Sequence, residues 1–388
     1  MSRFYSYLNT SKNIIENYAG EMPLAHHLRK FFKTSNKYGS KDRREISELV
    51  YNYYRVSNVL IVNDLEEKIL MSTYLCNENK SIVTEHLKVD WADSIHQSIN
   101  DKLIFLGINF DFKSIFPFPD QTSKSLDQSV FGLSFLTQPK LFVRIRPGFK
   151  NRIISQLIAE STDYELIEPD CLAFENGTKI DQILKVGQEV IIQDYSSQIV
   201  GDILDKYLLS DNARPTVWDC CAASGGKSIR MYDSNNQIEL TVSDVRESIL
   251  ENLKERFHLA GIKHYKSLLA DLTNKNSAID EKFDLILADV PCSGSGTWAR
   301  TPEEKHFFKK EKIQEYASLQ YQIVSNVIAN LKTGGYLIYI TCSVFELENE
   351  AQVEKILENY PLVLIEQKLL VGIEHQADSM FIAVLRKQ

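Results

Sequence analysis

Cysteine is scarce in this chain of 388 residues, which contains only six. Two of the six are adjacent, Cys220 and Cys221, so they form neither the disulfide framework of a small secreted domain nor a spaced set of zinc ligands. No hydrophobic run approaches the roughly 18 residues that a membrane-spanning helix needs. The N-terminal segment is polar and interrupted, unlike a signal peptide. We therefore expect a cytoplasmic protein that binds no membrane and no metal.

An overall positive charge is also lacking, because the formal net charge is -8. This argues against a protein that binds nucleic acid over its whole surface. Two segments are nevertheless basic. Residues 1–60 contain ten Lys or Arg against five Asp or Glu, and residues 138–155 contain five basic residues and no acid. Either segment alone could be an ordinary solvated surface, but the two together indicate where a polyanion could bind.

The pattern of apolar residues divides the chain into three predicted domains. Residues 1–130 are predicted to be helical, with apolar residues at helical spacing (Leu24, Leu28 and Phe32, for example), and prolines near residues 116–125 predict a linker. Residues 131–195 contain short β-like runs and are predicted to form a small α/β unit. In residues 196–388 strands and helices alternate, which predicts a doubly wound, mostly parallel sheet of the Rossmann-like class.

Two details of this last region are specific expectations. One helix carries Ile313, Val324 and Leu331 at helical spacing and is expected to end at Gly334 and Gly335. After it we expect the strand YLIYIT, a helix through residues 350–357 and the terminal strand FIAVL.

Ligands of such sheets bind beyond the carboxyl ends of the strands, and the segment DCCAASGGKS (219–228) is predicted to lie there, between a strand and a helix. Its consecutive glycines allow a ligand to approach the backbone, and the amides of a helix N-terminus attract an anionic group. It is not a P-loop, because Cys221 stands where the first glycine of that motif would be. The GxGxxG fingerprint is absent as well.

Two acidic residues follow the next predicted strands. Asp244 could accept the two hydroxyls of a ribose, and Asp271 could reach an adenine edge. Either residue alone could equally be a helix N-cap. Together with the anion-binding loop they predict a nucleoside that carries an anionic group, and S-adenosylmethionine fits this description.

Two cysteines, Cys292 and Cys342, are predicted to follow adjacent buried strands, the first in ADVPCSGSG beside Asp289 and the second in ITCSVFELENE. A buried structural cysteine is the ordinary explanation of either one. A helix N-terminus, however, lowers the pKa of a thiol, and the thiolate is the nucleophile. Zinc is a weaker alternative, since each loop offers a single thiol and no histidine is near in sequence.

Three segments of the chain resemble motifs of one family. DCCAASGGKS is similar to D-x-C-A-A-P-G-G-K-T, DVPCSGSGTWARTPE (289–303) to D-A-P-C-S-G-x-G-x-x-R-R-x-P-D, and TCSVFELENE (341–350) to T-C-S followed by E-N-E. These are motifs of the Sun-type RNA 5-methylcytosine methyltransferases, and the resemblance spans about residues 190–388. The segment GSKDRREISELVYNYYR (39–55) resembles the NusB-like helical domain of the family's bacterial ribosomal-RNA members.

The resemblance implies a class I methyltransferase fold, S-adenosylmethionine as cofactor and RNA as partner, with small-subunit ribosomal RNA favoured over transfer RNA. It implies Cys342 as the thiolate that adds to C6 of cytosine, Asp289 as the group that holds the N3/N4 edge of the base, and Cys292 as the group that assists loss of the C5 proton. We expect a monomer. The expected cofactor-binding residues are Cys221, Ala222, Ala223, Ser224, Gly225, Gly226, Lys227, Asp244, Asp271 and Asp289.

Three positions depart from the family pattern. Ser224 replaces a proline in the cofactor loop, Ala299 replaces the first arginine of the R-R pair and leaves Arg300 alone, and Arg146 stands where the family often has asparagine. From charge we expect Arg144, Arg146 and Lys150 to contact RNA phosphates, and from the motif we expect the same of Arg300.

Four alternatives remain open from the sequence. The two cysteines could exchange roles, since DNA cytosine methyltransferases use the Pro-Cys thiol as nucleophile. The substrate could be transfer RNA, or a small molecule. The chain could also be a catalytically idle RNA-binding factor in ribosome assembly.

Overall fold

The computed structural model describes residues 3–35, 37–78, 81–208, 214–274 and 279–388. The chain divides into two compact units. Unit 1 comprises residues 1–120, 127–138 and 297–309, and unit 2 comprises residues 121–126, 139–296 and 310–388. Each unit therefore combines segments that are distant in sequence. The expected three-domain division at residues 130 and 195 stays a prediction.

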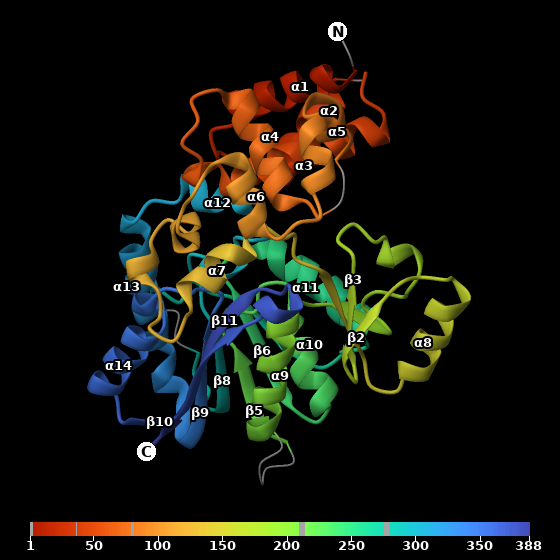
Figure 1. Cartoon of the computed structure of the whole chain (residues 1–388). Helices are drawn as coiled ribbons and strands as arrows, with labels where there is room; N and C mark the ends of the chain where they lie inside the picture. Colours follow the sequence, from red (N-terminus) through yellow and green to blue (C-terminus); the bar gives the residue numbers. More distant parts are fainter. Residues whose placement is uncertain (1–2, 36, 79–80, 209–213, 275–278) are drawn as a thin grey trace. The chain divides into compact units, whose positions relative to one another are not determined.

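Unit 1 is helical, as expected (Figure 1). The helix predicted around Leu28 is present, and α4 begins at Leu65 with Asp64 as its N-cap. The helices are α1 (Arg3–Asn17), α2 (Leu24–Thr34), α3 (Ser40–Val56), α4 (Leu65–Cys76), α5 (Ile82–Leu87), α6 (Ile99–Leu106), α7 (Gln128–Ser134) and α12 (Pro302–Phe307).

The segment 297–309, which follows the DVPCSGSG motif, packs into the core of unit 1. Phe307 of α12 contacts Tyr18, with 5.3 Å between the ring centroids. The buried guanidinium of Arg55 on α3 donates to the carbonyl oxygen of Phe135 at 3.1 Å and to that of Ala299 at 2.8 Å. One arginine thus joins the three chain segments of unit 1. At position 299 the contact uses the backbone, so the replacement of arginine by alanine does not affect it.

Unit 2 contains two sheets. The smaller has the strand order β2-β3-β1-β4 with antiparallel pairing, and the helix α8 (Lys150–Ala159) packs against it. It corresponds to the small α/β region expected from the sequence. Its strands are β1 (Leu141–Ile145), β2 (Glu165–Glu168), β3 (Cys171–Phe174) and β4 (Val190–Ile192).

The larger sheet has seven strands in the order β10-β11-β9-β8-β5-β6-β7. The pairs from β9 to β7 are parallel, whereas β11 runs antiparallel to both of its neighbours. The predicted mostly parallel sheet is confirmed. The strands are β5 (Thr216–Asp219), β6 (Glu239–Asp244), β7 (Lys266–Leu269), β8 (Phe283–Asp289), β9 (Leu331–Thr341), β10 (Leu362–Val371) and β11 (Ser379–Lys387).

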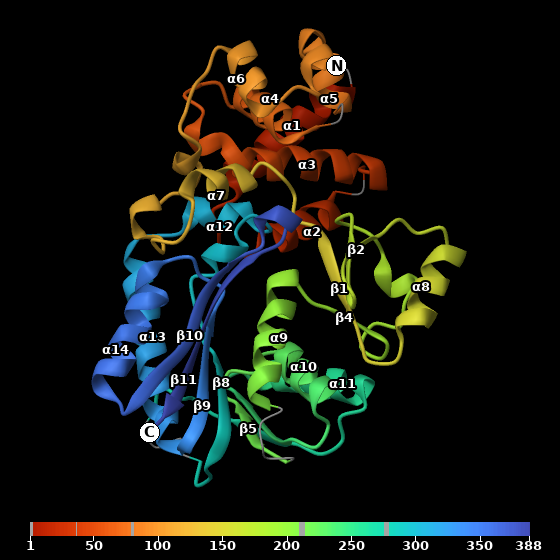
Figure 2. The ribbon, with the colours of Figure 1, turned by 60° about the horizontal axis from the view of Figure 1, so that its bottom comes forward.

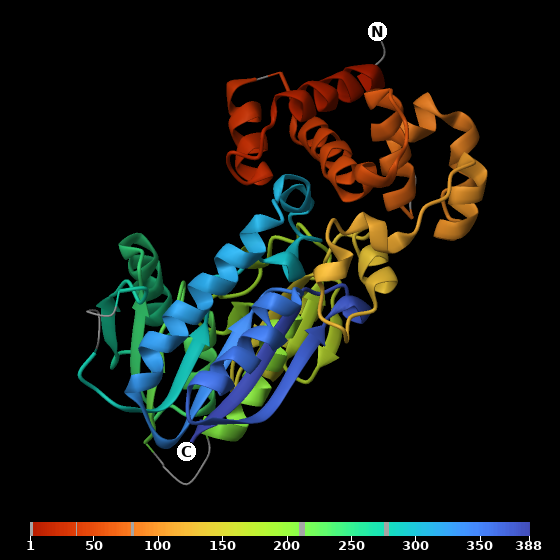
Figure 3. The same ribbon diagram turned by 90° about the vertical axis from the view of Figure 1, so that its left-hand side faces the viewer.

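Helices cover both faces of this sheet (Figure 2). On one face α9 (Tyr195–Leu208), α10 (Gly226–Ser234) and α11 (Glu247–Ala260) share a hydrophobic cluster with the strands. On the other face α13 (Glu311–Val327) and α14 (Glu350–Asn359) share a second cluster, and Figure 3 views the sheet from this side. Burial on both faces explains why the central strands are continuous apolar runs.

Two expectations about element boundaries were wrong. The helix expected to end at Gly334 ends at Val327, and Leu331 already begins β9, which runs through both glycines. A Cβ at Gly335 would lie 2.8 Å from the carbonyl oxygen of Asp284, so this position of the sheet admits only glycine. The strand β10 was not expected at all.

Candidate active site

A cleft of about 500 Å³ opens at the carboxyl ends of β5, β6, β8 and β9. It brings together most of the chemistry predicted from the sequence. The predicted residues that line it are Cys221, Ala223, Asp244, Asp271, Asp289, Cys292 and Cys342. A larger cavity, of about 680 Å³, lies at the opposite, amino ends of the strands and contains none of the predicted site residues. We therefore place the candidate active site in the smaller cleft.

The cofactor loop connects β5 to α10 and requires a glycine at one position. Gly225 has φ +79°, in the left-handed region, and a Cβ there would lie 2.5 Å from Cε1 of Phe257. Ala223 also has a positive φ, of 46°. The loop therefore packs closely against Phe257 as it enters α10, whose N-terminus favours negative charge.

Asp219, the last residue of β5, was not among the predicted site residues. Its carboxylate is buried and accepts a hydrogen bond from Oγ of Ser228 at 2.6 Å, but Oδ1 has no hydrogen-bond partner among the described residues. Burial raises the pKa of Asp219 to about 7. The first residue of the DCCAASGGKS motif is thus a buried acid with a free acceptor, beside the loop.

Asp244 lies at the end of β6, as predicted. Its Oδ2 accepts from the amide of Ala223 at 3.1 Å, and its Oδ1 accepts from the amide of Arg246 at 2.9 Å. Burial alone would raise the pKa of Asp244, but hydrogen bonds from Arg246 outweigh it and hold the pKa below its ordinary value. The residue is therefore an ionised acceptor, as the binding of a ribose would need.

Asp271 is exposed at the rim of the cleft. It accepts hydrogen bonds from the amide of Thr273 at 3.0 Å and from its hydroxyl at 2.6 Å. These bonds lower the pKa of Asp271. The structure thus places Asp271 at the cleft. Its hydrogen bonds to Thr273 have the geometry of an N-cap, which was the alternative to a function in adenine binding.

The two cysteines meet in the cleft. The backbone amide of Cys342, just after β9, donates to Sγ of Cys292 at 3.2 Å. A hydrogen bond with the side chain of Cys342, together with burial, raises the pKa of Cys292 well above its ordinary value. Cys292 is therefore a neutral thiol in this state, and the two residues are close enough to act on one substrate.

Lys227 makes an ion pair that the sequence did not predict. Its Nζ donates to Oδ2 of Asp289 at 2.6 Å. Burial would lower the pKa of Lys227, but the charges of Asp289 and of Cys342 raise it above its ordinary value. The lysine of the GGKS motif is thus a stable cation beside both the predicted base-binding acid and the predicted nucleophile.

A buried polar network supports the cysteine loops. Glu348 accepts from the amide of Ser293 at 2.9 Å, from the hydroxyl of Ser343 at 2.8 Å and from Nε2 of Gln320 at 2.8 Å. Burial raises the pKa of Glu348. Sequence reasoning matched this glutamate only as part of the E-N-E motif. Its function in the structure is to tie the loop after β8 to the loop after β9.

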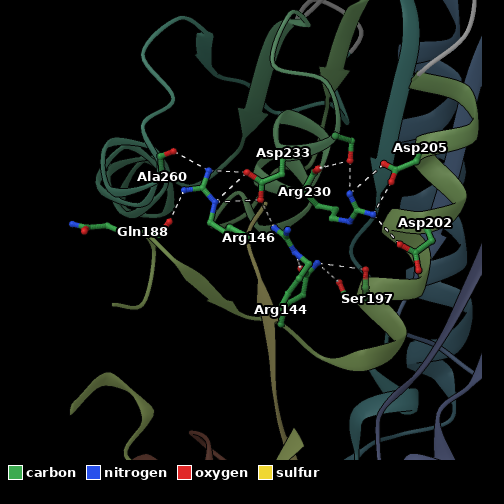
Figure 4. Close-up of polar contacts among 11 residues, drawn as sticks. Arg144, Arg146, Gln188, Ser197, Asp202, Asp205, Arg230, Asp233 and Ala260 are labelled. Atoms are coloured by element: carbon green, nitrogen blue, oxygen red, sulfur yellow. Dashed lines mark hydrogen bonds and ion pairs between the residues drawn. The ribbon is translucent and has the colours of Figure 1, made fainter. Parts of the chain in front are cut away.

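Two of the predicted RNA-contacting residues lie elsewhere than expected (Figure 4). Arg144 on β1 and Arg146, which directly follows β1, both pair with Asp233 at the end of α10, at 2.8 Å and 2.7 Å. Their side chains are only 6% and 10% exposed. Because each guanidinium is buried against a carboxylate, neither is available to a phosphate, and the expectation for these two residues is corrected. The run had no acid nearby in sequence, but the fold supplies one.

The other two predicted RNA contacts stay predictions. Lys150 begins α8 and is half-buried. Arg300 is half-buried in the segment 297–309 of unit 1.

The larger sheet and its helices form the Rossmann-like fold of class I methyltransferases, and comparison with known proteins shows which family the chain is similar to. Residues 206–386 match the family described as "16S rRNA methyltransferase RsmB/F". This part of the chain is therefore similar to the RsmB/F methyltransferases, in agreement with the resemblance of the three motifs to the Sun-type family. The match to a methyltransferase family also supports S-adenosylmethionine as the cofactor.

Among curated proteins, the "Probable ribosomal RNA small subunit methyltransferase B" of Bacillus subtilis is 29% identical over 232 residues, which is 58% of this chain and 51% of that protein. The "Ribosomal RNA small subunit methyltransferase B" of Yersinia enterocolitica is 26% identical over 249 residues, which is 63% of this chain and 55% of that protein. The matched region thus spans about half the length of these relatives.

Solved structures show the same fold. The structure of the protein PH0851 has a TM-score of 0.69 and 20% identity, and the match covers 94% of both chains. The structure of NSun6 from Pyrococcus horikoshii has a TM-score of 0.58 and 16% identity, over 72% of this chain and 98% of that chain.

Neither a membrane-spanning helix nor a metal-binding cluster is found among the described residues. In that part of the chain, none of the helices combines the length and the apolar character needed to cross a membrane. The same residues contain no group of three or more His, Cys, Asp or Glu side chains that could hold a metal ion.

Proposed function

We propose that this chain is an S-adenosylmethionine-dependent RNA methyltransferase that modifies C5 of cytosine in small-subunit ribosomal RNA. The observation that carries the proposal is the meeting of Cys292 and Cys342 in one cleft with the ion pair of Lys227 and Asp289. A methyltransferase that acts on a more nucleophilic atom needs no pair of thiols. Cytosine C5 needs one, because it reacts only after a nucleophile has added at C6.

The residues present fit the cofactor. Gly225 lets the loop pack closely against Phe257 at the edge of the cleft, and the carboxylates of Asp219 and Asp244 offer acceptors for an ammonium group and a ribose. The amides at the start of α10 would hold the carboxylate of the cofactor. S-adenosylmethionine, when bound, supplies the methyl group. The expected function of Asp271 at the adenine edge belongs to the same proposal.

Cys342 is proposed as the nucleophile. Its thiolate forms a bond to C6 of the cytosine, and the electron pair of the C5=C6 bond becomes available at C5. The ammonium group of Lys227 stabilises the thiolate before addition, and Asp289 hydrogen-bonds the N3/N4 edge of the base. After methylation at C5 a base must remove the C5 proton. The S–C6 bond then breaks, and the thiolate of Cys342 leaves.

The electrostatics of the cleft suit Cys292 for this second step. The pKa of Cys292 is raised first by its hydrogen bond to Cys342 and then by burial. When the Cys342 sulfur is bonded to the substrate, its hydrogen bond with the Cys292 side chain is lost, so Cys292 can release its own proton to solvent and its thiolate can then accept the C5 proton. In the free enzyme Cys292 is neutral, which disfavours the alternative in which it is the nucleophile.

The RNA-binding surface is proposed to lie on α2, the turn after it and the start of α3 rather than on β1. Exposed cations gather there: Arg29, Lys30, Lys33, Lys37 and Lys41. In the described part of the chain these five side chains make no ion pair. Cations at this density neutralise phosphates without reading sequence. A cytosine must also leave its stack to reach the cleft, so unpaired RNA is the favoured substrate.

The proposal is tested by incubating the protein with methyl-labelled S-adenosylmethionine and unmodified small-subunit ribosomal RNA, with transfer RNA in parallel and Cys342→Ala as control. Label in 5-methylcytidine from ribosomal RNA, lost in the variant, is the expected result. Label only in transfer RNA would contradict ribosomal RNA as the proposed substrate. Absence of label from both, in a protein that binds the cofactor, would favour an idle assembly factor.

The names of the curated relatives support ribosomal RNA as substrate. The protein is proposed to act as a monomer, which light scattering of the purified chain would test.

A further inference from the structure

The cofactor loop differs from the family motif at one position, where Ser224 replaces a proline. A proline would fix its own φ and restrict the residue before it. The loop here has no such restraint, although it contains Ala223 at φ 46° and Gly225 at φ 79°. Glycine adopts its conformation readily, but the positive φ of Ala223 is unfavourable for a residue with a Cβ, so another contact has to hold the loop in place.

That contact is made by Arg256 on α11. One guanidinium nitrogen donates to the carbonyl oxygen of Ser224 at 2.8 Å and also contacts its hydroxyl oxygen. The next residue of the helix, Phe257, packs against Gly225, so α11 supports two successive residues of the loop.

Arg256 has no carboxylate partner in the part of the chain that the structure describes. Burial lowers its pKa, and no acidic side chain compensates for this. A partly buried arginine that donates only to a loop carbonyl and a hydroxyl is poorly explained as part of a surface ion-pair network. Its contacts are explained if it fixes the loop.

We propose that Arg256 is a positioning residue for the cofactor loop and replaces, through its hydrogen bonds to Ser224, the restraint that a proline provides elsewhere in the family. The inference rests on the proposed function, because the loop is assigned to S-adenosylmethionine. It goes beyond that function by naming a residue outside the cleft that sets the affinity for the cofactor. Arg256 does not touch the reacting atoms.

The test is a double-mutant cycle in the full-length protein, with Kd for S-adenosylmethionine measured by calorimetry and with KM and kcat measured on RNA. Losing a charge-assisted hydrogen bond should raise Kd and KM about tenfold in Arg256→Ala and leave kcat within about threefold. In a Ser224→Pro background the same substitution should raise Kd less than about threefold, because the proline restrains the loop without the arginine. Ser224→Ala, which removes only the hydroxyl, should be intermediate between the wild type and Arg256→Ala.

Lys254→Ala is the matched control, since Lys254 is an exposed cation on the same helix. It should bind the cofactor as the wild type does. The inference is overturned if Arg256→Ala binds the cofactor like the wild type, or if the loss is equally large with proline at 224. If Arg256→Ala fails to fold, Ser224→Ala decides, and unchanged affinity in that variant overturns the inference. A wild-type protein that does not bind S-adenosylmethionine would instead overturn the proposed function, and the inference with it.

Discussion

The amide of Cys342 donates a hydrogen bond to Sγ of Cys292 across 3.2 Å, although 50 residues separate the two in sequence. They follow adjacent parallel strands, β8 and β9, whose carboxyl ends meet at one edge of the sheet. The two thiols therefore line one cleft and can act on the same substrate. The order of events at that pair is the centre of the proposed mechanism, and the predictions below test the groups around it.

Lys227 should be needed for chemistry and not only for cofactor binding. Lys227→Ala removes the cation beside Cys342 and Asp289, so kcat should fall about 100-fold or more, as for loss of other preorganised charges. Measurement of kcat and KM checks this. An unchanged kcat with a raised KM for S-adenosylmethionine would restrict Lys227 to the cofactor.

Gly225 should tolerate alanine much less well than Gly261. Both have a φ near +78° (79° and 77°), and alanine costs about 1–2 kcal/mol in this region. At Gly261 nothing lies within 4 Å of the added Cβ, whereas at Gly225 the Cβ would lie 2.5 Å from Phe257. We expect Gly225→Ala to lower the melting temperature more and to weaken cofactor binding. Equal effects of the two substitutions would contradict the close packing of the loop.

Asp219 should make stability depend on pH. Its pKa in the folded protein is about 7, above the ordinary value of 3.8. The folded state therefore holds a proton that the unfolded state has released between these two values, so stability falls as pH rises from about 4 to about 7. Asp219→Asn keeps an acceptor for Ser228 but does not titrate. Unfolding by urea at pH 5 and pH 8 should show the variant gaining stability over the wild type at the higher pH, and a constant difference would refute the assignment.

The arginines of β1 should matter for stability rather than for RNA. Arg146→Ala breaks a buried ion pair with Asp233 and should cost about 3 kcal/mol of unfolding free energy. Arg152→Ala is the matched control, because that arginine is 56% exposed in its pair with Glu189 and should contribute less than about 1 kcal/mol. Chemical denaturation measures both.

The salt dependence of RNA binding separates the two candidate surfaces. Replacement of Lys30 and Lys33 on α2 should reduce the slope of log K against log salt by about 1 for each cation. The Arg146→Ala protein, where it is folded, should keep the wild-type slope. A reduced slope in Arg146→Ala, with an unchanged slope in the α2 variants, would indicate that RNA binds near β1.

Much of the site could be predicted from the sequence, because its residues lie at the ends of strands and each strand can be recognised from the local sequence. Asp244, Asp289 and Cys342 each end a strand or follow one directly, and parallel strands bring such positions together whatever the rest of the fold does. The motif also contained Glu348, but its bonds to Ser293 depend on packing between two loops, which spacing alone does not reveal.

The predictions that were wrong depended on contacts between residues that are distant in sequence. Arg144 and Arg146 were expected on the surface because no acid lies near them in sequence, and their partner Asp233 is 87 residues beyond Arg146. The strand β10 was missed because it is an edge strand that alternates poorly between buried and exposed residues. The early end of α13 was missed because Gly334 and Gly335 belong to the close contact of β9 with β8, not to a helix cap.

The most direct test of the central claim is to trap the covalent intermediate. Cys292→Ala, mixed with substrate RNA and S-adenosylmethionine, should accumulate an RNA–protein complex that survives denaturing electrophoresis, because the C5 proton is not removed and the S–C6 bond persists. Cys342→Ala and the double variant should form none. A stable complex with Cys342→Ala, and none with Cys292→Ala, would contradict the account and give Cys292 the nucleophilic role.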